Sequence, residues 1–113
     1  AVGVNAGRVT QGTGSVCVGN GAGQNTAGDY AVLIGNGAGN VATSSNTVAI
    51  GKGAGGLGTT TDCVILNGAG GNFPTATTVA GFYIQPMRGL ALGIGAGVMY
   101  YDTTTKEVVY STN

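Results

Sequence analysis

Residues 46–55 read N-T-V-A-I-G-K-G-A-G: three consecutive apolar residues at 48–50, followed by a glycine at every second position. A helix would need an apolar period of 3.6 residues, and each glycine in its interior would cost about 1 kcal/mol relative to alanine. A short, mostly β-branched run bounded by glycine is typical of a buried strand instead. The stretch therefore predicts a strand that ends in a tight corner.

The same stretch recurs at intervals of 16 residues. V-C-V-G-N-G-A-G at 16–23 matches 32–39 and 48–55, and V-I-L-N-G-A-G at 64–70 repeats it with one residue deleted. Counting back 16 residues from 18–19 finds Val2 and Gly3, so the pattern is already under way at the first residue, as expected for a piece of a longer protein. Such short units have no core of their own, and the sequence therefore predicts a solenoid whose stacked turns supply the core.

Both faces of the predicted strands are apolar. Alternate side chains of a strand point to opposite faces, so the first and third residues of each triplet share one face and the middle residue takes the other. The residues expected to pack in the core or between chains are Val16, Cys17, Val18, Val32, Leu33, Ile34, Val48, Ala49, Ile50, Val64, Ile65 and Leu66. A thin turn of 16 residues covers only one of these faces. We therefore expect further copies of the chain to cover the other, in an obligate, cyclic homo-oligomer.

The glycines after each triplet are predicted to form the corners of the turns. These corner residues are Gly19, Gly35, Gly51, Gly23, Gly39 and Gly55. Glycine there permits a positive φ and a close approach of two backbones. G-N-G-A-G is superficially like a phosphate-binding loop, but it lacks the Lys-Ser/Thr pair and the following helix. The polar stretches 24–30, 40–46 and 56–62 are expected to form the outward face of each turn.

Composition excludes several classes of function. Four basic and four acidic residues cancel among 113, so the chain lacks the basic footprint of a nucleic-acid-binding protein. Without histidine there is no Ser-His-Asp arrangement and no usual zinc site, and we expect neither an enzyme nor a bound metal or cofactor. No apolar run approaches the roughly 20 residues of a membrane helix, so no membrane insertion is expected. Asp29 and Asp62 are interpreted as solvated turn residues, with ion binding as the alternative.

The C-terminal part has a different pattern. Residues 98–111 consist of an apolar stretch, an Asp-Thr-Thr-Thr-Lys stretch typical of a turn, and a second apolar stretch, which predicts a β-hairpin. We divide the chain into glycine-rich repeats at 1–78 and a neck or linker with the hairpin at 79–113. Tyr100, Tyr101 and Tyr110 are expected in the packed core of the hairpin, with a sugar-binding platform as the alternative. Cys17 and Cys63 fall in different columns of the repeat and are predicted to be small buried thiols.

The repeat resembles known adhesion proteins. N-T-V-A-I-G-K-G-A-G is similar to the head repeat of trimeric autotransporter adhesins of the YadA type, in which S-V-A-I-G precedes small residues and a glycine. The period of 16 and the G-x-G-A-G corner depart from that pattern, and are similar to repeats of tail-fibre and attachment proteins of phages and large algal viruses. The stretch F-Y-I-Q-P-M-R at 82–88, with V-M-Y-Y-D-T-T-T-K-E-V-V-Y-S at 98–111, looks like the segment that joins the β-roll of viral fibres to a C-terminal trimerisation or chaperone domain.

These resemblances imply both a fold and a function. The implied fold is an all-β, trimeric, left-handed parallel β-roll or β-helix solenoid of 16-residue repeats, with a C-terminal β-hairpin neck. The implied function is that of a structural and adhesive module in a virion fibre or host-attachment protein, located in the virion, with a cell-surface glycan or protein as receptor. The alternative is the head of a bacterial trimeric autotransporter adhesin, which would bind host matrix or cell surface from the bacterial cell surface.

Overall fold

A computed structural model describes residues 1–41, 43–59, 61–73, 79–87 and 98–111. All regular elements in these ranges are strands, which confirms the all-β prediction. The strands are β1 (Thr10–Gln11), β2 (Val16–Val18), β3 (Thr26–Ala27), β4 (Val32–Ile34), β5 (Val48–Ile50), β6 (Val64–Asn67), β7 (Phe82–Gln85), β8 (Val98–Tyr101) and β9 (Val108–Ser111). No helix in the described part of the chain could cross a membrane.

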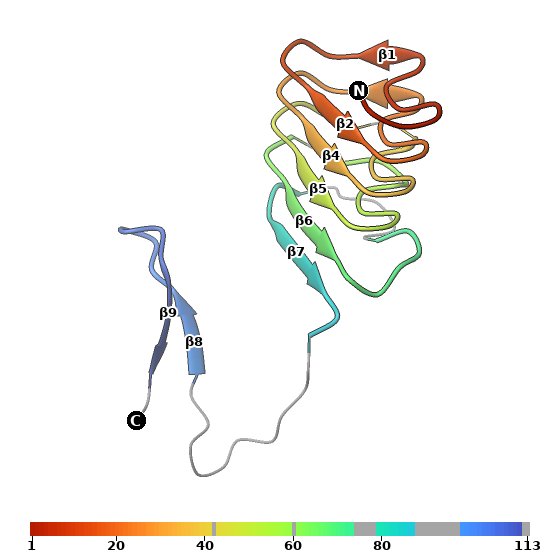
Figure 1. The fold of residues 1–113 in the computed structure, drawn as a ribbon. Coiled ribbons are helices and arrows are strands. Elements are labelled where there is room, and N and C mark those ends of the chain that lie inside the picture. The colour runs from red at the N-terminus through yellow and green to blue at the C-terminus, as the bar shows by residue number, and fades with distance from the viewer. Residues whose placement is uncertain (42, 60, 74–78, 88–97, 112–113) are drawn as a thin grey trace.

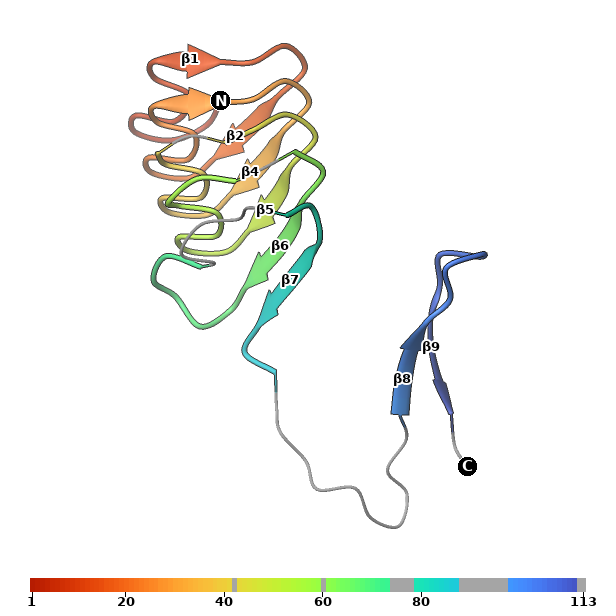
Figure 2. The ribbon, with the colours of Figure 1, turned by 180° about the vertical axis from the view of Figure 1, so that it is seen from behind.

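Strands β1 to β7 form a parallel β-solenoid of about four turns (Figure 1). Five of them make one parallel sheet in the order β2-β4-β5-β6-β7, and β1 pairs with β3 in a second parallel sheet. Val16 pairs with Val32, which pairs with Val48, which pairs with Val64, so equivalent triplet residues lie directly above one another. The predicted parallel solenoid is thus confirmed, and Figure 2 shows the same stack of turns from behind.

The core of the solenoid contains the middle residue of each triplet. Cys17, Leu33, Ala49 and Ile65 are completely buried, and small residues from the other sides of the turn pack against them, including Ala22, Ala38 and Ala54. The triplet residues before and after the middle one point away from this interior. Because small side chains oppose the larger ones, the two walls of each turn come close together, and the solenoid is thin.

The polar stretches are not wholly outward, as the sequence analysis expected. Ala27, Thr43 and Thr59 come from these stretches and are buried. Side chains alternate in extended backbone, so every second residue of the polar wall points inward. The threonines are tolerated there because their hydroxyls are paired: Thr43 Oγ1 donates to the Gly39 carbonyl at 3.1 Å, and Thr59 Oγ1 accepts from the Ser44 amide at 3.1 Å.

The corners after β2, β4 and β5 require glycine because the turns stack very closely. Gly19 has φ of +125°, and Gly35, which stacks on it, has φ of +131°. A Cβ on Gly19 would lie 2.6 Å from the Gly35 carbonyl oxygen. Neighbouring turns are separated only by the spacing of hydrogen-bonded strands, about 4.8 Å. An L-residue at this corner would therefore be strained by its backbone angle and by the carbonyl of the next turn.

The last strand of the parallel sheet, β7, lies within the segment assigned from sequence to the neck. Val64 of β6 pairs with Phe82, eighteen positions later, whereas the earlier strands pair with residues sixteen positions later. Beyond β7, strands β8 and β9 pair antiparallel and form the expected hairpin. Asp102 Oδ1 accepts hydrogen bonds from the amides of Thr104 at 2.7 Å and Thr105 at 3.0 Å, and so orders the turn. The division of the chain into two domains stays a prediction.

Candidate oligomer interface

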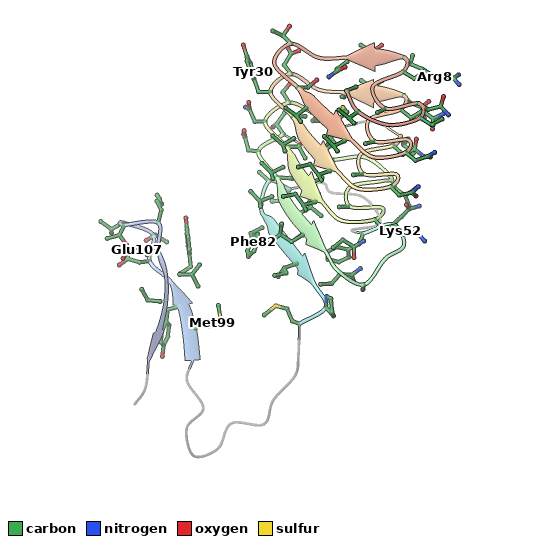
Figure 3. The ribbon with its side chains drawn as sticks, in the orientation of Figure 1. Arg8, Tyr30, Lys52, Phe82, Met99 and Glu107 are labelled. Carbon is green, nitrogen blue, oxygen red and sulfur yellow. The ribbon has the colours of Figure 1, made fainter. Side chains whose placement is uncertain are left out.

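The outer surface of the five-stranded sheet is an exposed apolar face. Its side chains are the first and third residues of each triplet: Val16, Val18, Ile34, Ile50 and Val64 are between 36 and 45% exposed, and Val32, Val48 and Leu66 are half-buried. β7 continues the face with Phe82 and Ile84, and Figure 3 shows Phe82 projecting from that strand. We call this surface, made by the first and third triplet residues of β2, β4, β5 and β6 together with Phe82 and Ile84, the apolar face.

The apolar face results directly from the geometry of the turn. Leu33 and Ile34 are adjacent in β4, yet Leu33 is wholly buried while Ile34 is exposed. The turn has one interior, and strand alternation sends only the middle column into it. Covering a Val, Leu, Ile or Phe side chain completely is favourable by about 1.5–3 kcal/mol. An uncovered row of such side chains on several strands is the kind of surface that marks a protein–protein contact.

No charge interrupts the apolar face. Within the five strands the residues are V-C-V, V-L-I, V-A-I, V-I-L-N and F-Y-I-Q. Because a charged group would have to be desolvated when another surface covers it, its absence lowers the cost of association. The strands therefore present the composition of an interface core rather than that of a solvated sheet.

The acidic residues next to the sheet bridge neighbouring turns. Asp29 Oδ1 accepts a hydrogen bond from the Thr13 amide at 2.7 Å, and Asp62 Oδ1 accepts one from Asn46 Nδ2 at 3.1 Å. Both bonds join residues one turn apart, which gives these carboxylates a structural role. Among the described residues, no three histidine, cysteine, aspartate or glutamate side chains come together where they could hold a metal ion.

Asn67 is a buried polar residue that sequence reasoning missed. It occupies the position that is Gly51 in the preceding turn and is almost fully buried. Its Nδ2 donates to the carbonyls of Lys52 at 2.7 Å and Gly71 at 2.8 Å, and its Oδ1 accepts from Gln85 Nε2 at 2.8 Å. The side chain thus connects the last corner to β7 with its polar groups paired. The one sequence signal that this corner differs from the others was the residue deleted from the fourth repeat.

The two cysteines are buried thiols, as predicted. Cys17 is part of the middle column, and Cys63 immediately precedes β6 in the wall of the next-to-last turn. Burial raises the pKa of the Cys17 thiol. The protonated thiol is neither nucleophilic nor a good metal ligand, so Cys17 acts as a small packing residue.

The hairpin tyrosines do not form one platform. Tyr100 pairs with Val109 and Tyr101 with Val108 across the hairpin. Neighbouring residues of a strand point to opposite faces, so Tyr100 and Tyr101 lie on opposite faces of the hairpin. Both are more than half exposed. The side chains of Tyr100 and Tyr101 are therefore not packed in a core within the described part of the chain, and they do not share one face of the hairpin; the side chain of Tyr110 lies outside the described part.

Searches of protein-family models, curated proteins and solved structures found no match to this chain.

Proposed function

We propose that this chain is a structural and adhesive module of a virion fibre or host-attachment protein. In this proposal three copies pack their apolar faces together as a homotrimeric, left-handed β-roll of 16-residue repeats, with the hairpin as its neck. The observation that supports it most strongly is the apolar face itself, which continues in register from β2 to β7 and which the chain leaves uncovered. Three copies related by a threefold axis would cover one another's faces and close the assembly.

The hydrogen bonding of the solenoid suits a load-carrying rod. Gly19 N donates to the Val2 carbonyl at 2.7 Å, Gly35 N to Val18 at 2.8 Å and Gly51 N to Ile34 at 2.8 Å. These bonds run from turn to turn along the stacking axis, so extension of the rod loads many backbone bonds together. Residues that are neither in the triplets nor at the corners can vary from turn to turn without disturbing the core. In this proposal they form the surface that binds a cell-surface glycan or protein.

Immunogold electron microscopy with an antibody against this chain tests the proposed function. Virus particles and bacterial cells from the source material would be labelled in parallel. We expect gold along fibres on the particles. Gold on the bacterial surface alone would instead identify the chain as the head of a bacterial trimeric adhesin, and gold on neither structure would contradict both functions.

A cell-binding assay tests the adhesive part of the proposal. The purified oligomer should sediment with host cells more than the Ile34→Ala variant of the apolar face does at a concentration where that variant has dissociated. Treating the cells with glycosidases or with proteases before the assay would distinguish a glycan from a protein receptor. Equal sedimentation of the oligomer and the variant would show that binding does not need the assembled fibre.

A further inference from the structure

A large gap separates the apolar face from the C-terminal hairpin. It has a volume of about 800 Å³. Phe82 and Ile84 of β7 line it on one side, and Met99, Tyr101 and Val108 of the hairpin line it on the other. Figure 3 shows Phe82 and Met99 extending from β7 and β8 at this gap. The gap is thus bounded by one chain on two sides, and both sides are apolar.

The hairpin has two apolar faces, and most of the hairpin residues that line the gap come from one of them. The strand pairing places Met99, Tyr101 and Val108 on one face, while Tyr100 and Val109 lie opposite each other on the other face. Tyr100 also lines the gap, whereas Val109 does not. Met99, Tyr100, Tyr101, Val108 and Val109 are all between 42 and 64% exposed. A two-stranded hairpin is at best marginally stable in water, so these side chains need a covering surface.

The chemistry of the gap does not suit a small polar ligand or bulk water. Binding pockets combine apolar walls with several placed polar groups. Here Asp62 is the one charged side chain in the lining, and its Oδ1 already accepts a hydrogen bond from Asn46. An apolar space of this size is unfavourable when filled with water. A second apolar protein surface matches it best.

We propose that the gap of each chain is filled by the hairpin of a second copy, which inserts its Tyr100 and Val109 face against Phe82 and Ile84. This inference rests on the proposed homotrimer and adds to it the element that locks the neck. Phe82 and Ile84 belong both to the apolar face and to the gap, so the contact is continuous with the proposed interface. The hairpin of one copy meets β7 of the next, so the two contacting surfaces are different. Such a head-to-tail contact closes into a ring when it is repeated around a threefold axis.

Disulfide trapping tests this arrangement in the complete 113-residue chain. The starting variant carries Cys17→Ala and Cys63→Ala; alanine already occupies the equivalent positions at Ala49 and Ala31. Phe82→Cys and Val109→Cys are then added together and the protein is oxidised. The control variant pairs Phe82→Cys with Thr104→Cys instead of Val109→Cys; Thr104 lies at the exposed tip of the hairpin turn.

Denaturing electrophoresis of the oxidised protein shows which chains have been joined by disulfides. Light scattering of the same protein before oxidation gives the number of chains in the assembly. We expect covalent trimers as the main product from the 82/109 pair and single chains from the 82/104 pair. Single chains closed by an internal 82–109 bond, from protein with the mass of three chains, would overturn the exchanged hairpin but leave the homotrimer intact. Covalent dimers without larger species would contradict the ring. A mass of one chain before oxidation would contradict the homotrimer itself.

Discussion

At the scale of single residues, two positions in each turn decide the structure. The corner glycine lets neighbouring turns stack, and the middle triplet residue fills the interior. Gly35 and Leu33 show both roles in one turn: Gly35 has φ of +131°, and Leu33 is completely buried. The sequence showed the regular spacing of both positions, but both faces of the triplet are apolar. The column that points inward could therefore be assigned only from the structure.

Replacement of corner glycines should reveal how close the turns stack. Gly35 and Gly37 both have positive φ, at 131° and 67°. A Cβ on Gly35 would lie 2.5 Å from the Gly51 carbonyl oxygen, whereas one on Gly37 would have no atom within 4 Å. We expect Gly37→Ala to cost about 1–2 kcal/mol of unfolding free energy from backbone strain alone, and Gly35→Ala at least about 3 kcal/mol. Denaturant unfolding followed by circular dichroism measures both, and equal losses would contradict the stacking argument.

At the scale of the elements, strand alternation separates the core of the solenoid from its apolar face. The short parallel strands and the C-terminal hairpin were predictable because apolar runs, glycine corners and the Asp-Thr-Thr-Thr-Lys turn have clear sequence signals. The inward Ala27, Thr43 and Thr59 were missed because their polar neighbours mask the alternation. β7 does not follow the 16-residue spacing, because its residues pair with residues of β6 that lie eighteen positions earlier, so the sequence placed it in the neck. Asn67 of β6 and Gln85 of β7 are joined by a side-chain hydrogen bond.

Two adjacent residues of β4 should separate folding from assembly. Leu33→Ala removes a fully buried side chain and should lower the unfolding free energy by about 2–5 kcal/mol at every protein concentration. Ile34→Ala removes an exposed one and should weaken association, so the oligomer of this variant should dissociate on dilution at concentrations where the oligomer of Leu33→Ala stays intact. Light scattering across a hundredfold concentration range distinguishes the two effects. An Ile34→Ala oligomer that resists dilution as well as the Leu33→Ala oligomer would show that Ile34 is not at an interface.

The hairpin turn should depend on pH through Asp102. Hydrogen bonds from the amides of Thr105 and Thr104 lower the pKa of this carboxyl below its ordinary value. A lowered pKa means that the carboxylate stabilises the turn at neutral pH, and that this contribution is lost as the pH falls through the folded-state pKa. NMR titration should therefore show the amide signals of Thr104 and Thr105 moving together, with a midpoint below that of an ordinary aspartate. In Asp102→Asn these amides should not titrate in that range; an unchanged titration would exclude Asp102 as its source.

At the scale of the whole molecule, the thin solenoid and its uncovered apolar face together call for assembly. Ile50 is 40% exposed on that face, and Leu57, outside the five-stranded sheet, is 43% exposed. We expect Ile50→Asp to abolish the oligomer and leave poorly soluble protein, because a buried, unpaired charge is costly at an interface. Leu57→Asp adds the same charge at similar exposure and should leave the oligomer intact. Gel filtration compares the two, and loss of the oligomer in both would show that the apolar face is not the specific contact.

The mass of the purified chain in solution tests the central claim most directly. Light scattering coupled to gel filtration should give three times the 10.9 kDa of one chain, unchanged on dilution to low micromolar concentration. A stable, monodisperse species of one chain mass, well folded by circular dichroism, would show that the apolar face needs no partner and would contradict the account.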